Sequence, residues 1–193
     1  MAIQTERFEQ VHVANADALW SWLADNHGQA ESVWLVTYKK SVPEKYLSTD
    51  TILDALIAYG WIDGIRRKLD DTRTMQLIGP RPTQAWAQSY KDRAARLIAE
   101  GRMTDAGQRS IDASKAAGLW DYWADVDALI CPDDLAKSLQ ANPAAQAYYN
   151  AAAPSYRRNL LRWVKLAKTD KTRDTRIARI VTACAAGQRI PQM

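Results

Sequence analysis

The chain has few of the side chains that bind metals or form disulfide bonds. Its 193 residues include only two cysteines, Cys131 and Cys184, and two histidines, His12 and His27. Structural zinc sites take four such ligands at short, regular spacings, and the sequence has no CxxC pair. It also has no complete catalytic signature. We therefore expect neither a metal site nor a cofactor.

Long apolar runs are also missing. No stretch approaches the roughly 20 apolar residues that a membrane-spanning helix needs. The first ten residues, MAIQTERFEQ, have neither the apolar core of a secretory signal nor the Arg-rich pattern of a transit peptide. We expect a cytoplasmic protein with reduced thiols and no membrane insertion.

Phenylalanine is scarce, and tryptophan is the main large aromatic residue. The chain has one Phe and eight Trp. Because Trp is large and mostly apolar, packing in the core is the expected role for most of them. Those that lie in segments with a regular apolar pattern are Trp20, Trp22, Trp34, Trp120, Trp123 and Trp163.

Acidic residues are scarce near the C-terminus. The chain carries a net charge of +4, but residues 151–193 contain ten basic and only two acidic residues. Such a segment can bind a polyanion. It can equally be a solvated helical face, because Arg and Lys are good helix formers. The expected inward residues are Leu160, Leu161, Val164 and Leu166, and the expected outward ones are Arg157, Arg158, Arg162, Lys165 and Lys168.

Apolar periodicity and capping residues predict an α+β fold. Helices are expected at 15–27, with Asn15 or Asp17 as cap, and at 48–60, with Ser48 or Thr49 as cap. Gly28 and Gly60 should end these helices in the left-handed conformation. Residues rich in β-branched and aromatic side chains predict strands at 32–40, 61–69 and 73–79, the last two forming a hairpin.

The second half of the chain reads as helical. Helices should begin near residues 86, 104, 132, 143 and 154, and a last one should cover 171–187. Thr104 is a probable cap, and Pro132 and Pro143 suit the first turn of a helix. The small antiparallel sheet of about three strands and its helices would form a subdomain over 1–85. A helical subdomain would cover 86–193, and we expect the two to pack as one compact unit.

Several motifs resemble those of a known family. They are VWLVTYKK (33–40), GWIDGIRRKLDD (60–71), GPR (79–81), RLIAEGRMTDAG (96–107), NPAAQAYY (142–149) and PSYRRNLLRWVKLAKTDKTRDTRIARI (154–180). With these motifs the chain is similar to the YdeI/OmpD-associated family of bacterial proteins, also described as bacteriocin-protection proteins. GWIDG together with GRMTDAG is the most specific pair.

The resemblance implies a fold and an association, but no reaction. It implies a first half like the YjbR/CyaY-like folds, with a small antiparallel sheet backed by helices. The chain departs from the family pattern near Trp86, where relatives usually read Ser-x-Trp-Ser-x-x-Asn and this chain has Ala87 and Tyr90. It also has Lys171 where relatives usually have Glu. If the replaced polar groups serve a shared function, the ligand has changed or been lost.

One carboxylate lies on an otherwise apolar strand face. In residues 61–69, alternation places Asp63 on the face of Trp61, Ile65, Arg67 and Leu69. An unpaired buried carboxylate is costly, so Asp63 needs a partner or an opening to solvent.

Three local arrangements could satisfy Asp63. Arg66 could reach it through a bulge at Gly64, and Arg81 could return to it across the sheet. Alternatively, Asp63 could accept backbone N–H bonds and lock the turn between Gly60 and Gly64.

A site around Asp63 would be mostly apolar with a few convergent polar groups. Its expected lining is Trp61, Asp63, Arg66, Arg81, Trp86, Tyr90 and Lys39 or Lys40. A carboxylate between aromatic faces favours a cationic or hydrogen-bond-donating aromatic ligand. Asp63 is also the candidate general acid or base. Helix capping explains His27, and packing explains His12.

Three functions follow from these features. The first is a small-molecule-binding protein that protects the cell by sequestering its ligand. The second is an enzyme that acts on a small organic substrate through Asp63 or a histidine. The third is nucleic-acid or partner binding through residues 157–179. We favour the first, and the sequence does not indicate an oligomeric state.

Overall fold

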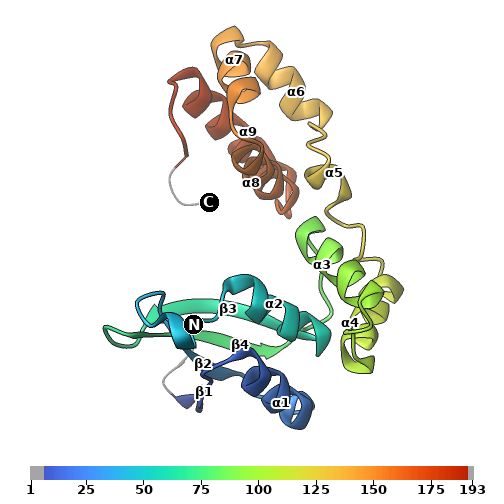
Figure 1. Ribbon diagram of the computed structural model, residues 1–193. Coiled ribbons are helices and arrows are strands. Elements are labelled where there is room, and N and C mark those ends of the chain that lie inside the picture. The colour runs from blue at the N-terminus through green and yellow to red at the C-terminus, as the bar shows by residue number, and fades with distance from the viewer. Residues whose placement is uncertain (1–6, 191–193) are drawn as a thin grey trace. The chain divides into compact units, whose positions relative to one another are not determined.

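The computed structural model describes residues 7–190 and divides the chain into two compact units, Met1–Asp121 and Tyr122–Met193 (Figure 1). The division between Asp121 and Tyr122 lies further along the chain than the boundary that the sequence suggests, between residues 85 and 86. Helices α3 (Gln88–Ala99) and α4 (Asp105–Ala116) pack on helix α2 (Thr49–Ala58) and so belong to the first unit. Residues 1–6, part of the stretch inspected for a leader, lie outside the described residues.

The expected α+β class is confirmed, and within residues 7–190 the sheet has four strands. They are β1 (Gln10–His12), β2 (Val33–Tyr38), β3 (Trp61–Lys68) and β4 (Arg73–Pro80), in the order β1-β2-β4-β3. Strands β2, β4 and β3 pair antiparallel, as the hairpin pattern predicts. Strand β1 was not predicted as a strand, and it pairs parallel to β2. Its three residues are too few to show a period of two.

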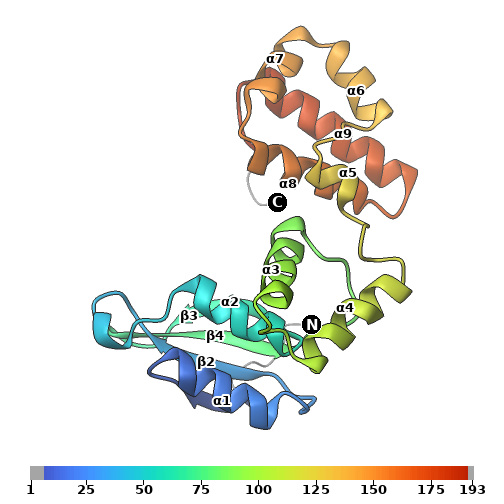
Figure 2. The ribbon, with the colours of Figure 1, turned by 45° about the vertical axis from the view of Figure 1, so that its right-hand side comes forward.

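One apolar core lies between the sheet and two helices (Figure 2). Helix α1 (Ala16–Asn26) contributes Leu19 and Leu23, and α2 contributes Ile52 and Leu56. They meet Leu35 of β2, which is fully buried. Burial of such side chains is the main source of stability for this unit.

Helix starts follow the predicted caps. Asn15 Oδ1 accepts the N–H of Ala18 at 2.8 Å, and Ser48 Oγ accepts the N–H of Thr51 at 3.0 Å. Gly60 has φ +70°, as expected beyond a helix end. Gly28 does not have a positive φ, so its predicted left-handed cap is wrong. Helix α1 instead ends at His27, whose N–H donates to Leu23 O at 2.9 Å.

The two most specific motifs, GWIDG and GRMTDAG, meet in space. The end of α2 lies against the start of α4, where Thr104 Oγ1 donates to Ala58 O at 2.5 Å. A Cβ added to Gly107 would lie 2.4 Å from Ala58 O, and one added to Gly60 would lie 2.8 Å from Ala106 O. Only glycine permits backbones to approach this closely. The pairing of these motifs therefore has a packing reason.

The second unit is helical. Its elements are α5 (Ala124–Asp127), α6 (Asp133–Gln140), α7 (Pro143–Ala151), α8 (Pro154–Lys165) and α9 (Asp170–Ala185). Helix α9 contacts α6, α7 and α8, and the four share a core that includes Leu135, Leu160 and Ile180. Leu166, expected inside, is 54% exposed because it lies just beyond the end of α8.

The tryptophans divide into fully and partly buried groups. Trp34, Trp61 and Trp86 are at most 3% exposed. Trp20, Trp22, Trp120, Trp123 and Trp163 are partly buried. Of the six expected in the core, only Trp34 is therefore fully buried. The two most buried tryptophans are those assigned from sequence to the ligand site.

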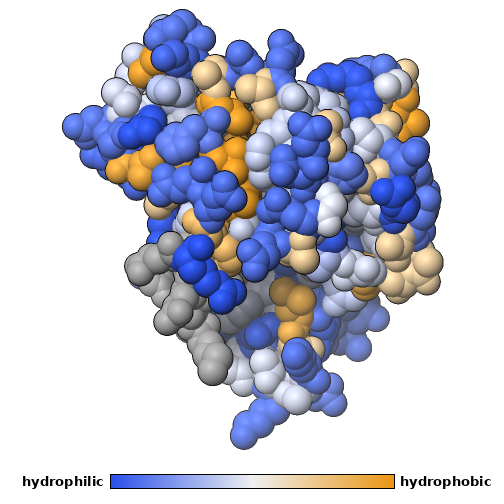
Figure 3. Space-filling model, turned by 90° about the horizontal axis from the view of Figure 1, so that it is seen from below, coloured by the Kyte–Doolittle hydropathy of each residue, from blue (hydrophilic) through white to orange (hydrophobic). Residues whose placement is uncertain are grey.

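The face of the molecule seen in Figure 3 is mostly hydrophilic. On the face seen in Figure 3, hydrophobic side chains gather in a few patches between hydrophilic ones. No helix within residues 7–190 combines the length and the apolar character needed to cross a bilayer.

Candidate functional site

A bulge in β3 places Asp63. The register between β3 and β4 shifts between Asp63 and Arg66, so the bulge predicted around Gly64 is present. A Cβ on Gly64 would lie 3.2 Å from Leu77 O, which leaves little room for a larger residue. The bulge also changes the alternation, and Ile65, expected on the face of Asp63, is 50% exposed.

Two neutral side chains donate hydrogen bonds to the Asp63 carboxylate. Tyr90 Oη donates to Oδ1 at 2.6 Å, and Gln76 Nε2 donates to Oδ2 at 3.1 Å. Gln76 Oε1 accepts in turn from Arg66 Nη2 at 2.6 Å. Asp63 thus connects β3 to β4 and α3 through these two hydrogen bonds.

The partners predicted for Asp63 are wrong in their details. Among the described residues, neither Arg66 nor Arg81 forms an ion pair with Asp63, and Arg66 reaches it only through Gln76. Within residues 7–190 the donors to Asp63 are side chains from β4 and α3, and not backbone N–H groups of the Gly60–Gly64 turn.

Arg81 lies between two aromatic rings beside Asp63. Its guanidinium carbon is 4.1 Å from the centroid of the Trp86 ring and 5.0 Å from that of Tyr90. The buried Nε and Nη2 atoms of Arg81 and the buried Nε1 of Trp86 have no hydrogen-bond partner among residues 7–190. Most buried polar groups in proteins are paired, so three neighbouring donors without acceptors are unusual. We call Asp63, Gln76, Arg81, Trp86 and Tyr90 the Arg81 cluster.

The Arg81 cluster is rich in donors at neutral pH. Burial lowers the pKa of Arg81 to about 10, although the neighbouring Tyr90 and Asp63 act in the opposite direction. Burial and the hydrogen bond to Asp63 raise the pKa of Tyr90 to about 12. The guanidinium is therefore charged and the phenol protonated at pH 7. Asp63, Arg81 and Tyr90 are each partly exposed, so the cluster reaches the surface.

Local contacts hold the segment that carries Arg81 and Trp86. The N–H of Arg81 donates to Gly60 O at 2.9 Å. The buried hydroxyl of Ser114 on α4 donates to Gln84 O at 2.8 Å. Trp86 packs on Trp120, with 5.3 Å between the ring centroids. The segment from Arg81 to Ala87, which lacks regular structure, is thus tied to the sheet and to α4.

Two residues of the predicted site lie elsewhere. Trp61 belongs to the core, where its Nε1 donates to His27 O at 3.0 Å. Lys39 Nζ donates to the carbonyls of Asp70 and Asp71 at 2.6 and 3.2 Å, so it holds the β3–β4 turn. These structural partners explain Trp61 and Lys39 without a ligand, and their place in a binding site stays a prediction.

Sequence reasoning missed Gln76. It is a polar residue in the strand segment RTMQLIG and is only 7% exposed. The reasoning that singled out Asp63, a polar side chain among apolar neighbours, would also have identified Gln76. Its register partner on β3 is Arg66, which explains the short bond between them.

The departures from the family pattern have structural consequences. Tyr90 replaces an expected Asn and provides the short bond to Asp63, so this position keeps a polar role. Ala87 is the N-cap of α3 and makes no side-chain cap bond. The serine usual in relatives at this position would suit a helix cap, so its loss is explained without a ligand.

The basic C-terminal face is only partly solvated. Arg162 pairs with Asp127 at 3.4 Å, and Lys165 pairs with Asp125 at 2.6 Å. Arg157 stacks on Tyr149. These side chains, expected to point into solvent, therefore contribute to packing and ion pairs within the second unit.

Each half of the chain matches a different family model. Residues 128–187 match the family described as "Bacteriocin-protection, YdeI or OmpD-Associated", which confirms that part of the resemblance. Residues 11–110 match a domain of unknown function instead of the YjbR/CyaY-like fold expected there. No curated protein and no solved structure matches the chain. Because the match to residues 11–110 covers just over half of its 193 residues, the chain belongs to the family described as "Domain of unknown function (DUF8412)".

Proposed function

We propose that this chain is a small-molecule-binding protein whose Arg81 cluster holds an acceptor group of the ligand. The observation that carries this proposal is the set of three buried N–H atoms on Arg81 and Trp86 that lack an acceptor. A ligand carboxylate or carbonyl would satisfy them, and Arg is suited to planar, bidentate recognition of a carboxylate. The ring of Tyr90, which is partly exposed, favours a ligand with an aromatic part.

The ligand class differs from the one that the sequence suggests. A carboxylate between aromatic rings favours a cation, but Tyr90 and Gln76 already donate to Asp63. The unsatisfied groups of the cluster are donors. The ligand group that fits them is therefore an acceptor, and a negatively charged one fits best beside Arg81.

We extend the proposal to a protective role in the cytoplasm, in which the chain sequesters its ligand. It is supported by the match of residues 128–187 to a family described by bacteriocin protection. Catalysis by Asp63 is less well supported, because the two hydrogen bonds that it accepts give it a structural role between β3, β4 and α3.

Replacing Arg81 by glutamine should weaken binding of aromatic carboxylates at least about tenfold, since a charge-assisted hydrogen bond contributes about 1.5–3 kcal/mol. The measurement is the rise in melting temperature with benzoate and indole-3-acetate, followed by titration calorimetry. Trp86→Phe, which keeps an aromatic ring but removes the Nε1–H, should weaken binding less.

Arg102→Gln is the matched control. Arg102 also stacks on a tryptophan, with its Cζ 4.8 Å from the Trp20 ring centroid, but it is not among the residues with buried unpaired N–H atoms. The Arg102→Gln variant should bind aromatic carboxylates as tightly as the wild type does. Stabilisation by benzylamine but not by benzoate would contradict the proposal and favour a cation at Asp63.

A further inference from the structure

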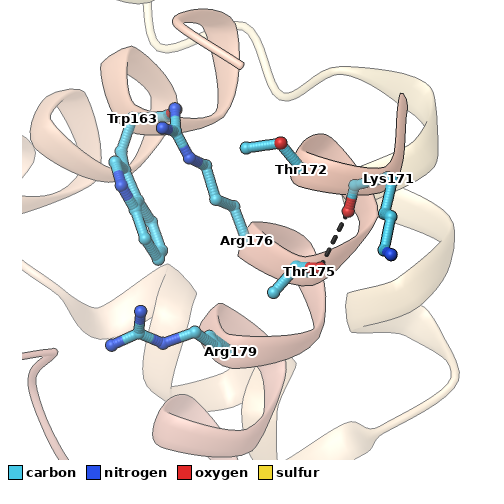
Figure 4. A pocket seen from close by; sticks show the side chains of 6 residues that line it. All are labelled: Trp163, Lys171, Thr172, Thr175, Arg176 and Arg179. Carbon is cyan, nitrogen blue, oxygen red and sulfur yellow. Dashed lines mark hydrogen bonds between the residues drawn. The ribbon is translucent and has the colours of Figure 1, made fainter. Parts of the chain in front are cut away.

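A second candidate site lies in the C-terminal unit. A pocket of about 430 Å³ opens between α8 and α9 (Figure 4). Its lining is Trp163, Lys171, Thr172, Thr175, Arg176 and Arg179. Figure 4 shows Trp163 and both arginine head groups on one side and the side chains of Lys171, Thr172 and Thr175 on the other. Pockets that bind small molecules have volumes of about 300–1,000 Å³.

The three cations of this pocket have no acidic partner. No carboxylate lines it, and within residues 7–190 Lys171, Arg176 and Arg179 form no ion pair. Arg173, one turn away, pairs with Asp134 through two hydrogen bonds. The unpaired positive charge of α9 therefore belongs to residues that line this pocket, the two arginines on one side and Lys171 on the other, and all three attract an anion in it.

Two arginines are positioned by one indole ring. The Cζ atoms of Arg176 and Arg179 lie 5.3 and 5.2 Å from the Trp163 ring centroid. Arg176 Nη1 also donates to Trp163 O at 2.5 Å. Guanidinium groups present a planar set of donors that matches phosphate oxygens. Because stacking restricts both groups before a ligand arrives, less entropy is lost on binding.

We propose that this pocket binds a phosphate-bearing small molecule of the nucleotide class. Lys171, Arg176 and Arg179 hold the phosphate oxygens, and Trp163 provides the apolar wall against the organic part. The pocket is larger than a phosphate group alone requires, and the indole gives it an aromatic surface.

The surroundings favour a small ligand over a nucleic-acid chain. A neighbouring pocket along α9 is lined by Asp134 and Asp174. Asp134 is already paired with Arg173, but a polynucleotide extended in that direction would bring its phosphates towards Asp174, and like charges repel. A ligand confined to the Trp163 pocket avoids them.

Calorimetry on the full chain tests this proposal with ADP, adenosine, inorganic phosphate and a ten-nucleotide single-stranded DNA as probes. ADP should bind at least tenfold more tightly than either adenosine or phosphate, and its affinity should fall as salt is added. The double variant Lys171→Gln/Arg179→Gln should weaken ADP binding at least tenfold. These two side chains are exposed and unpaired, so the variant should fold.

Two controls separate this site from other effects. Lys137→Gln removes an exposed charge of the same unit outside the pocket and should leave ADP binding unchanged. Arg81→Gln should also bind ADP normally, which separates this proposal from that for the Arg81 cluster.

Four results would overturn the proposal. The first is no binding of ADP, and the second is equal affinity for ADP and phosphate. The third is a loss of ADP affinity in Lys137→Gln as large as that in the double variant. The fourth is DNA binding that is at least tenfold tighter than ADP binding and is abolished by the double variant. The last would assign the surface to nucleic acid.

Discussion

Replacing Gly107 by alanine is expected to lower the free energy of unfolding by about 3 kcal/mol. The new Cβ would lie 2.4 Å from Ala58 O and 2.7 Å from Ile57 O, both backbone atoms at the end of α2. Alanine favours a helix by about 1 kcal/mol over glycine, but this gain is smaller than the cost of moving two packed helices apart. Urea denaturation of both proteins measures the difference.

Gly28→Ala is the control for Gly107→Ala. A Cβ at Gly28 would meet no atom within 4 Å, and Gly28 has no positive φ. This substitution should be neutral or stabilise the protein by about 0.5 kcal/mol, because it restricts the unfolded chain. A Gly107→Ala protein as stable as the wild type would show that α2 and α4 are not in close contact.

Replacing Asp54 by asparagine should cost about 3 kcal/mol at pH 7. The Asp54 carboxylate accepts from Arg93 Nη1 at 2.5 Å and from Arg96 Nη2 at 2.6 Å, and its side chain is only 12% exposed. It joins α2 to α3. Without its charge, the two arginines would remain close together and largely uncompensated at this position.

The cost of Asp54→Asn should depend on pH. Burial alone would raise the pKa of Asp54, but the hydrogen bonds from Arg96 and Arg93 outweigh burial and hold this pKa below 3.8. The stabilisation from the ionised form is thus fully present above pH 3.8 and is lost as the pH falls through the lower, folded-state pKa. Urea titrations at pH 7 and pH 2.5 should show the gap between wild type and variant narrowing in acid.

Asp50→Asn is the matched control for Asp54→Asn. Asp50 also pairs with Arg93, at 2.7 Å, but its side chain is 82% exposed. Exposed pairs contribute about 0–1 kcal/mol, so this variant should lose less than about 1 kcal/mol. If Asp50→Asn and Asp54→Asn cost the same, the burial of Asp54 is not the reason for its effect.

Gly107→Ala and Asp54→Asn both disturb contacts of α2, the helix that positions the candidate ligand site. Its carboxylates fix α3, the helix that carries Tyr90, and its C-terminal end meets α4 and leads to Gly60. The carbonyl of Gly60 in turn accepts from the N–H of Arg81. Mild destabilisation at either contact should therefore weaken ligand binding at the Arg81 cluster before the unit unfolds.

Most elements of the fold were predicted because their signals are local. A cap such as Asn15 or Ser48 bonds within its own first turn, and a bulge at Gly64 depends on a residue that the bulge itself contains. Strand β1 and helix α5 were missed, since three or four residues carry no period. The left-handed cap at Gly28 was wrong, because a glycine permits that conformation without requiring it.

The sequence by itself determined that Asp63 needs a polar environment, because a carboxylate on an apolar strand face is costly wherever the strand lies. It also determined that Arg81, Trp86 and Tyr90 lie close together, since ten residues of chain contain all three. Only the tertiary structure decided which of many available donors pairs with Asp63. Tyr90 and Gln76 are 27 and 13 residues away from it, and their approach depends on how α3 and β4 pack. Packing likewise placed Trp61 in the core and Lys39 at the hairpin turn, because a side chain takes the partner that the fold brings nearest.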